Sequence, residues 1–289
     1  MTQTSGPART ITTRRISFEK SLGDLPRHFA GEGDLVSSHI IAGLSSVFPD
    51  GEDFFVRSVR HFRDRITDPV LKRQVAGFIG QESVHGREHR VLNEKLAQLG
   101  YPTKQIERLT KAGLALRWRV LPAKSNLAVT AALEHFTASL AELVLTDEET
   151  RDALGHDAVR NLFIWHALEE SEHKAVAFDV YRAVGGTERM RIWTMKVIRV
   201  GFLLGSLVEI IVSLAMDRDT YRPGVLRQSL RRIRSSSLLN RKVWDQLREY
   251  DRPGFHPDDR DTTELIDRWR AELFGDGGAL ENQLAGSAA

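Results

Sequence analysis

Apolar residues recur every three or four positions along most of this chain, and no stretch of any length alternates strictly between apolar and polar residues. The first spacing is that of an α-helix and the second that of a β-strand, so the pattern predicts an all-α protein. We expect the longer helices to pack as a bundle and a few extra helices to follow them at the C-terminal end.

Caps and breaks divide this pattern into segments. Thr67-Asp68-Pro69 places a capping side chain before a proline in the first helical turn, and Gly100 is a typical helix stop. The predicted helices cover residues 34–47, 50–66, 69–99, 103–119, 125–146, 156–184 and 187–216, with two or three shorter ones after them. The predicted divisions are a polar N-terminal arm over residues 1–20, a helical domain over 21–260, and a C-terminal helix with a flexible tail over 261–289.

Two of these helices carry ionisable side chains in the middle of their apolar stripes. The first stripe consists of Leu71, Val75, Phe78, Glu82, His85, His89, Leu92, Leu96 and Leu99. The second consists of Val159, Phe163, His166, Glu170, His173, Ala177, Val180 and Val184. Glu and His side chains therefore point into the bundle, where each would cost several kcal/mol if it were buried without a partner.

Bound metal ions would remove this cost, because carboxylates and imidazoles then serve as ligands. Each stripe contains a Glu-x-x-His pair, the spacing that dimetal helical bundles use, and each is preceded by a helix with one inward Glu. The predicted ligands and catalytic residues are Glu52, Glu82, His85, Glu134, His166, Glu170 and His173. These oxygen and nitrogen donors favour two iron ions, with an iron–manganese pair as an alternative and zinc as a poorer fit. The competing interpretation is a set of buried structural ion pairs.

Several neighbouring side chains have less certain roles. His89 lies one turn beyond His85 and either ligates a metal or hydrogen-bonds to a ligand; we favour the second role. Glu169 and Glu172 lie further from the centre of their stripe than Glu170, which we prefer as the ligand. Structural or surface positions are expected for His39, His61, His135 and His156, and core packing for Trp118, Trp165 and Trp193.

The composition limits the possible chemistry. The chain has no cysteine, which excludes disulfides, thiolate catalysis, zinc–thiolate sites and iron–sulfur clusters. Hydrophobic residues make up 41% and charged residues 28% of the chain, which is typical of a soluble globular protein. The first residues contain no apolar stretch like that of a secretory signal, so we expect a cytoplasmic protein, with peripheral attachment to a membrane as the alternative.

One long segment is more apolar than the rest. Residues 200–216 are interrupted only by Glu209, but they are shorter than the roughly 20 residues that a membrane span needs. We expect this helix to be buried against the bundle or along an apolar tunnel, with peripheral membrane contact as the second interpretation and a span as the third. A basic run follows at residues 218–242, which indicates either a solvated surface or contact with an anionic membrane or an acyl carrier.

The order Glu, Glu-x-x-His, Glu, Glu-x-x-His resembles that of the ferritin-like dimetal-carboxylate proteins. The additional His166, four residues before Glu170, is similar to the extra ligand of the p-aminobenzoate N-oxygenase branch. The segments FPDGEDFF, QESVHGREH, EHF and WHALEESEHKAVAFDVY most resemble the bacterial family called predicted metal-dependent hydrolases, of the same superfamily. This resemblance covers about residues 35–260 and implies a ferritin-like helical bundle, two metal ions and O2 activation.

These observations lead to two functional hypotheses. The first is a non-haem dimetal oxidase or oxygenase that acts on an apolar or acyl-type small molecule and receives electrons from a donor. The alternative is a metal-dependent hydrolase that uses a metal-activated water. Iron storage and a non-enzymatic scaffold rank lower, no nucleic-acid partner is expected, and a homodimer remains an open alternative.

Overall fold

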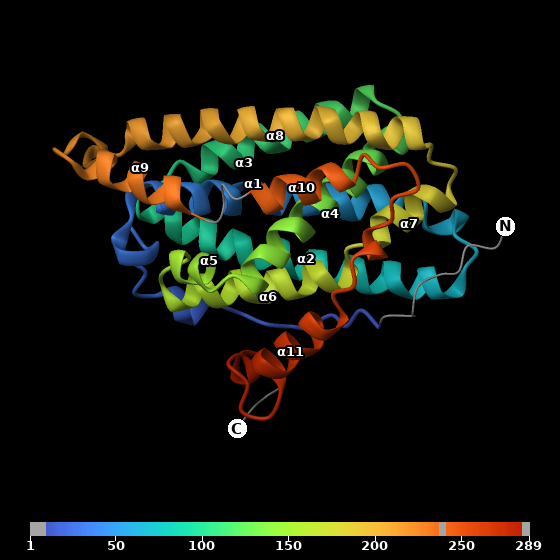
Figure 1. The fold of residues 1–289 in the computed structure, drawn as a ribbon, viewed down its shortest axis with the longest axis horizontal. Helices are drawn as coiled ribbons and strands as arrows, with labels where there is room; N and C mark the ends of the chain where they lie inside the picture. Colours follow the sequence, from blue (N-terminus) through green and yellow to red (C-terminus); the bar gives the residue numbers. More distant parts are fainter. Residues whose placement is uncertain (1–9, 237–240, 285–289) are drawn as a thin grey trace.

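The computed structural model describes residues 10–236 and 241–284. Within these ranges the protein is a packed helical bundle, and the one strand-like pairing is an isolated antiparallel bridge between Ile16 and Leu284 (Figure 1). The predicted all-α class is thus confirmed. The helices are α1 (Leu35–Arg60), α2 (Pro69–Gln98), α3 (Thr103–Val120), α4 (Ala123–Thr146), α5 (Glu148–Ala153), α6 (Asp157–His173), α7 (Val176–Ala183), α8 (Glu188–Met216), α9 (Val225–Ser235), α10 (Arg241–Glu249) and α11 (Thr263–Phe274).

Four helices form the part of the bundle that matters for function. α1 packs along α2, α4 packs along α6, and contacts of α1 with α4 and of α2 with α6 join the two pairs. α7 continues the path of α6 and contacts both α2 and α4. α3 covers α1, while α8 lies across α1 and α4 along one edge of the molecule, at the top of Figure 1.

The apolar core is divided into two large clusters. Along α2, Leu71 and Phe78 belong to one cluster, while Leu92 and Leu96 belong to the other. Buried apolar residues of α4 belong to both of these clusters, while those of α6 belong to one and those of α7 to the other. The polar residues of the α2 stripe therefore lie between two apolar layers, each of which shields them from water.

α1 is a single helix, whereas the sequence predicted two segments separated near Pro49. Proline cannot donate a backbone hydrogen bond, so the carbonyl of Ser45, four residues earlier, loses its usual partner. The side-chain amide of Asn93 on α2 donates to that carbonyl at 3.1 Å. The helix continues through the proline because a neighbouring helix satisfies the carbonyl.

The predicted helix over residues 156–184 is instead two helices. α6 ends at His173, α7 begins at Val176, and Lys174 and Ala175 lie between them. The Lys174 ammonium is buried and donates to the backbone carbonyl of Arg260 at 2.6 Å and to the hydroxyl of Thr262 at 3.1 Å. This buried ammonium ties the segment before α11 to the junction between α6 and α7.

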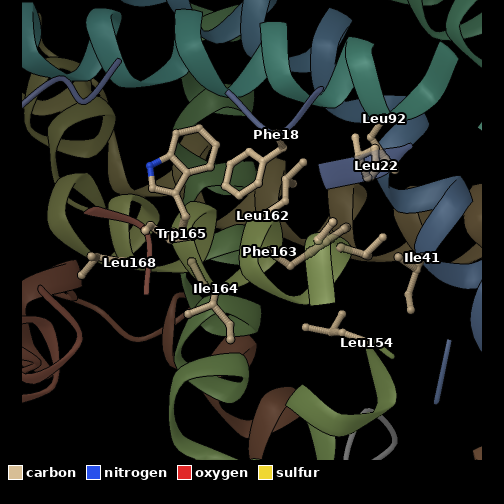
Figure 2. Packing of buried hydrophobic residues seen from close by; sticks show 14 of the residues in the cluster. Phe18, Leu22, Ile41, Leu92, Leu154, Leu162, Phe163, Ile164, Trp165 and Leu168 are labelled. Carbon is tan, nitrogen blue, oxygen red and sulfur yellow. The ribbon is translucent and has the colours of Figure 1, made fainter. Parts of the chain in front are cut away.

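The polar arm predicted for residues 1–20 is wrong for residues 10–20. Ile16 and Phe18 are buried, and Phe18 packs beside Trp165 and Leu162 of α6 (Figure 2). The backbone amide of Phe18 also donates to a buried carboxylate oxygen of Glu88 on α2, at 2.8 Å. Polar residues flank and separate Ile16 and Phe18 in the sequence, so the pattern did not predict that these two side chains are buried. Residues 1–9 and the C-terminal residues 285–289 of the predicted tail lie outside the described residues.

The expected burial of the helix over 200–216 is also wrong. α4 and α8 are both long and apolar enough to cross a membrane by length and composition, but they differ in burial. The most apolar window of α4 is 56% buried, as in a core helix, whereas that of α8 is only 11% buried. Trp193 on α8, predicted to be core, is 68% exposed. α8 therefore rests on the bundle with one side and presents a long apolar side outward.

We predict that Phe18→Ala destabilises the fold by roughly 3–5 kcal/mol, because it leaves a cavity against Trp165. The measurement is urea-induced unfolding monitored by circular dichroism. Exposed Lys20→Ala is the control and should change the unfolding free energy by less than about 0.5 kcal/mol. Equal stability of the two variants would show that the N-terminal segment does not contribute to the core.

Candidate metal centre

The seven predicted site residues meet in the layer between the two apolar clusters. They come from four helices: Glu52 from α1, Glu82 and His85 from α2, Glu134 from α4, and His166, Glu170 and His173 from α6. All seven are buried, with at most 4% of any residue exposed. Residues up to 121 positions apart in the sequence are thus brought to one place, between Glu52 and His173.

Their ligand atoms form two groups. Glu52, His85 and His166 each offer one atom within 4.8 Å of the others, and Glu82, Glu170 and His173 do the same. Glu170 lies between the groups, because its Oε1 is 3.1 Å from His166 Nε2 and 3.4 Å from His173 Nε2. Two adjacent cation positions that share one carboxylate fit this arrangement.

Glu134 and Glu82 complete the second group. Glu134 Oε2 is 3.4 Å and Glu82 Oε1 is 3.0 Å from His173 Nε2. Glu82 Oε1 is also 3.7 Å from His85 Nδ1 of the first group. Gly86, one residue after His85, leaves space for Glu52, because a Cβ atom there would lie 3.2 Å from the Glu52 Oε2 atom.

Many of these buried polar atoms have no hydrogen-bond partner. The set comprises both carboxylate oxygens of Glu52, Glu82 and Glu134, together with His85 Nδ1 and His173 Nε2. Buried polar atoms in folded proteins are nearly always hydrogen-bonded. A group of unpartnered atoms in one place therefore requires an explanation. Unpaired carboxylate oxygens and imidazole nitrogens directed at one another are a donor set for metal ions, and these residues therefore fit such ions.

The pKa shifts of the buried carboxyl groups also fit a site for a cation. Burial, and then the neighbouring Glu134, raise the pKa of Glu82 to about 8. Burial, and then Glu170, raise the pKa of Glu134 to about 7, and the pKa of Glu52 is raised well above its usual value for the same kinds of reason. Burial alone would raise the pKa of Glu170 as well, but His173 and His166 lower it well below its usual value. Without a cation, the site thus holds protons on some of its carboxyl groups.

Two of the three histidines are oriented by acceptors outside the site. His85 Nε2 donates to Glu169 Oε2 at 3.0 Å, so its Nδ1 carries the lone pair that faces Glu82 and Glu170. His173 Nδ1 donates to Gln81 Oε1 at 2.8 Å, so its Nε2 faces the carboxylates. Such outer hydrogen bonds fix the tautomer and ring orientation of metal-ligating histidines.

The outer acceptors converge on Arg14, from the N-terminal segment. Its guanidinium donates to Glu169 at 2.8 Å and to Glu172 at 2.8 and 2.7 Å. Glu172 also accepts from Gln81 Nε2 at 2.7 Å, which fixes Gln81 with its carbonyl oxygen toward His173. One arginine therefore supports both histidine orientations from outside the four helices.

His166 is oriented by a separate chain that ends at Asn93. The Ser45 hydroxyl donates to Asn93 Oδ1 at 2.7 Å, so it accepts from His89 Nδ1 at 2.9 Å. His89 Nε2 is then an acceptor, and His166 Nδ1 donates to it at 2.7 Å. The His166 Nε2 lone pair therefore faces Glu170, and His89 uses both ring nitrogens in the chain, in agreement with the hydrogen-bonding role favoured from the sequence.

Several site contributors were not found from the sequence. Arg14 and Gln81 lie in the N-terminal segment or off the centre of a helical stripe, and periodicity gives them no signal. Glu169 and Glu172 were set aside as ligands, and the structure gives them the role of outer hydrogen-bond acceptors. His135, although adjacent to Glu134, is structural: its Nε2 faces the carbonyl of Gln246 at 3.0 Å.

A third group of possible ligand atoms is of a different kind. His28, His39 and Asp217 offer atoms within 4.8 Å of one another. Asp217 is already paired with Arg27 at 3.2 Å and with both histidines, and His39 Nδ1 contacts the Ser213 hydroxyl at 2.6 Å. These atoms are satisfied within the protein, so the group fits a structural network that joins α1 to the end of α8.

A cavity of 340 Å³ lies beside α4 and α10, but none of the seven site residues lines it. Its lining includes the charged residues Lys174, Arg252, Arg260, Glu142 and Glu249. The charged lining distinguishes this cavity from the apolar surroundings of the site.

Comparison with known proteins gives one finding. A family model described as predicted metal-dependent hydrolase matches residues 12–261. Searches of curated proteins and of solved structures found no match.

We predict that the metal-free protein loses thermal stability as the pH rises from about 6.5 to about 8. The folded state binds protons on Glu82 and Glu134 with pKa values of about 8 and 7, against about 4.5 when unfolded, so stability falls with pH through this window. His173 acts in the same direction, because burial lowers its pKa but the nearby carboxylates, Glu170 first, raise it well above the usual value. Histidines with lowered pKa values add no further change above about 6.5.

The measurement is the thermal midpoint of chelator-treated protein across that window. Glu82→Gln should reduce the dependence, because the amide does not titrate while Glu134, Glu169 and Glu209 still do. Exposed Glu94→Gln on the same helix should leave it unchanged. A midpoint that is constant or that rises with pH would contradict the assignment of protons to the site.

Proposed function

The chain belongs to the family of predicted metal-dependent hydrolases, and from this membership we propose that it is a metalloenzyme whose seven core residues hold two metal ions. The observation that carries the proposal is the donor set. Three histidines present a nitrogen lone pair to the same space, and three carboxylates there have both oxygens unpartnered. Among the described residues, Glu82 and Glu134 lie within 3.4 Å of His173 and form no ion pair with an arginine or lysine. The Glu172 carboxylate, in contrast, is held by Arg14 and Arg270.

We propose oxidation of an apolar or acyl-type small molecule as the reaction that the donor set favours. Four carboxylates and three imidazoles without sulfur suit iron or manganese better than structural zinc. Bound in this site, two such ions would supply electrons for the reduction of O2. An external electron donor is then required for repeated turnover.

The residues of the chain supply the other requirements. Aromatic rings pack against the histidines. The ring centroids of Phe78 and His173 are 5.0 Å apart, and those of Trp165 and His85 are 4.9 Å apart, which excludes water from this side of the site. Phe48 lies 4.7 Å from His166 and forms part of the apolar wall. Glu82 and Glu134 have raised pKa values in the metal-free site, so metal binding would displace protons from them.

Hydrolysis is the second candidate, and the family description favours it directly. Two adjacent cations can activate a water molecule and polarise an ester or phosphoryl oxygen. The same seven residues would hold the ions, and Glu134 or Glu82 would accept the proton from the water. The two candidates therefore differ in the metal and the co-reactant and share the ligands.

We predict that the purified protein contains about two iron or manganese ions per chain and that Glu170→Ala loses most of them. Glu170 lies between both groups of ligand atoms, so its removal weakens both positions. The measurement is elemental analysis after expression in iron- and manganese-supplemented medium. Glu94→Ala, an exposed residue on α2, is the control and should retain the metal. Full metal content in Glu170→Ala would refute this site.

We also predict O2 consumption by the iron-loaded protein in the presence of a chemical reductant, at a rate at least tenfold above that of Glu170→Ala. The parallel measurement uses zinc- and manganese-loaded protein with panels of carboxylic and phosphate esters. Ester turnover without O2 consumption would replace oxidation by hydrolysis. If neither activity responds to Glu170→Ala, the enzymatic proposal is wrong.

A further inference from the structure

α8 presents an apolar surface that the bundle does not cover. Its outward residues include Val200, Leu204, Leu207, Val208 and Ile211, each at least half exposed. Exposed apolar side chains continue from Val197 to Met216, so the stripe is about 28 Å long. Exposed apolar patches of this kind are rare on monomeric soluble proteins and usually mark a binding surface.

The two acidic residues of α8 do not interrupt this stripe. Glu188 pairs with Arg191 at 2.7 Å at the start of the helix. Glu209 turns inward, because a Cβ atom at Gly43 of α1 would clash with its carboxylate. Its burial raises its pKa to about 7. The outward surface of α8 is thus apolar without an acidic side chain.

Basic side chains flank the stripe at both ends. Arg189 and Lys196 are exposed near the beginning of α8. Past its end, α9 carries Arg227, Arg231 and Arg234 on its exposed side, at a spacing of four and three residues. Apolar side chains with basic residues around them are complementary to an anionic lipid surface, which offers hydrocarbon and negative headgroups together.

Aromatic residues mark the same two ends. Trp193 is 68% exposed near the first end, and Tyr221 is 72% exposed just beyond the second. Tryptophan and tyrosine are enriched at the depth where lipid headgroups meet the hydrocarbon. Their positions match a helix whose two ends lie at the same depth.

The polar side of α8 is hydrogen-bonded to the rest of the protein near both ends, so a membrane that contacts its outer side would meet the helix lying flat. Arg191 donates to the carbonyl of Arg252 at 2.9 Å, and Arg199 donates to that of Leu247 at 3.0 Å. Near the other end, Ser213 contacts His39 of α1 at 2.6 Å. A spanning orientation would break these bonds.

We propose that the outward surface of α8, with the basic side of α9, docks the protein on an anionic phospholipid membrane. A second copy of the chain is a poorer occupant. Both ends of the stripe are basic, so either parallel or antiparallel pairing of two α8 helices would bring like charges together. The docking surface is independent of the proposed metal chemistry.

The experiment is flotation of the full chain with vesicles of neutral phosphatidylcholine, with or without 30% phosphatidylglycerol. We expect binding to the anionic vesicles and weaker binding as salt increases. Arg227→Gln/Arg231→Gln should weaken it by about 30-fold, at roughly fivefold per charge. Lys72→Gln/Arg73→Gln, two exposed cations of α2, is the matched control and should bind as the unmodified chain does.

The apolar contribution is tested with Leu204→Gln/Val208→Gln, which should weaken binding by at least about tenfold. Both side chains are exposed, so circular dichroism should show an unchanged fold. Trp193→Phe should remove the blue shift of tryptophan emission upon vesicle binding, and the same shift in that variant would place the stripe away from the lipid. Glu170→Ala should still bind, which separates this test from that of the metal site.

Three results would overturn the proposal. The first is no preference for anionic vesicles, and the second is unchanged binding in the arginine and leucine–valine variants. The third is a dimer in gel filtration that Leu204→Gln/Val208→Gln dissociates, without vesicle binding, which would assign the stripe to a second copy.

Discussion

The main constraint on this structure is the free-energy cost of burying several carboxyl groups close together in the middle of the bundle. Glu52, Glu82 and Glu134 are buried with both oxygens unpartnered, and among the described residues their ion-pair contacts are with histidines. The two apolar clusters on either side make this layer dry, which increases the cost of each charge. A bound cation would offset this cost, so the stability of the fold and the capacity to bind metal are coupled through the same residues.

Arg14 neutralises the two carboxylates just outside the site, Glu169 and Glu172. Its position depends on the N-terminal segment being folded onto the bundle. Ile16 and Phe18 anchor that segment in the core, and the anchors bring the guanidinium to Glu169 and Glu172. The carboxylates then hold His85 directly and His173 through Gln81. The packing of Ile16 and Phe18 thus stabilises the orientation of two imidazole rings that lie at least 67 residues further along the sequence.

The two sides of α8 differ in chemistry. Its inner side packs on α1 and α4 and is hydrogen-bonded to His39 and to the segment around Tyr250, whereas its outer side is apolar. Hydropathy alone could not distinguish this helix from α4, since both are long and apolar enough to span a membrane. The distinction arises from what covers each helix, and that depends on the packing of residues distant in the sequence.

The sequence alone determined the all-α class, most helix boundaries and all seven inward residues of the site, because helical periodicity fixes which side chains share one face of one helix. Tertiary structure decided what lies between helices. Asn93 satisfies the carbonyl freed by Pro49, so one helix replaced two. Arg14, Gln81 and the Asn93–Ser45–His89 chain set the lone pairs of the histidines. These effects depend on distances between separate elements, and a one-dimensional pattern of apolar and polar residues carries no information about such distances.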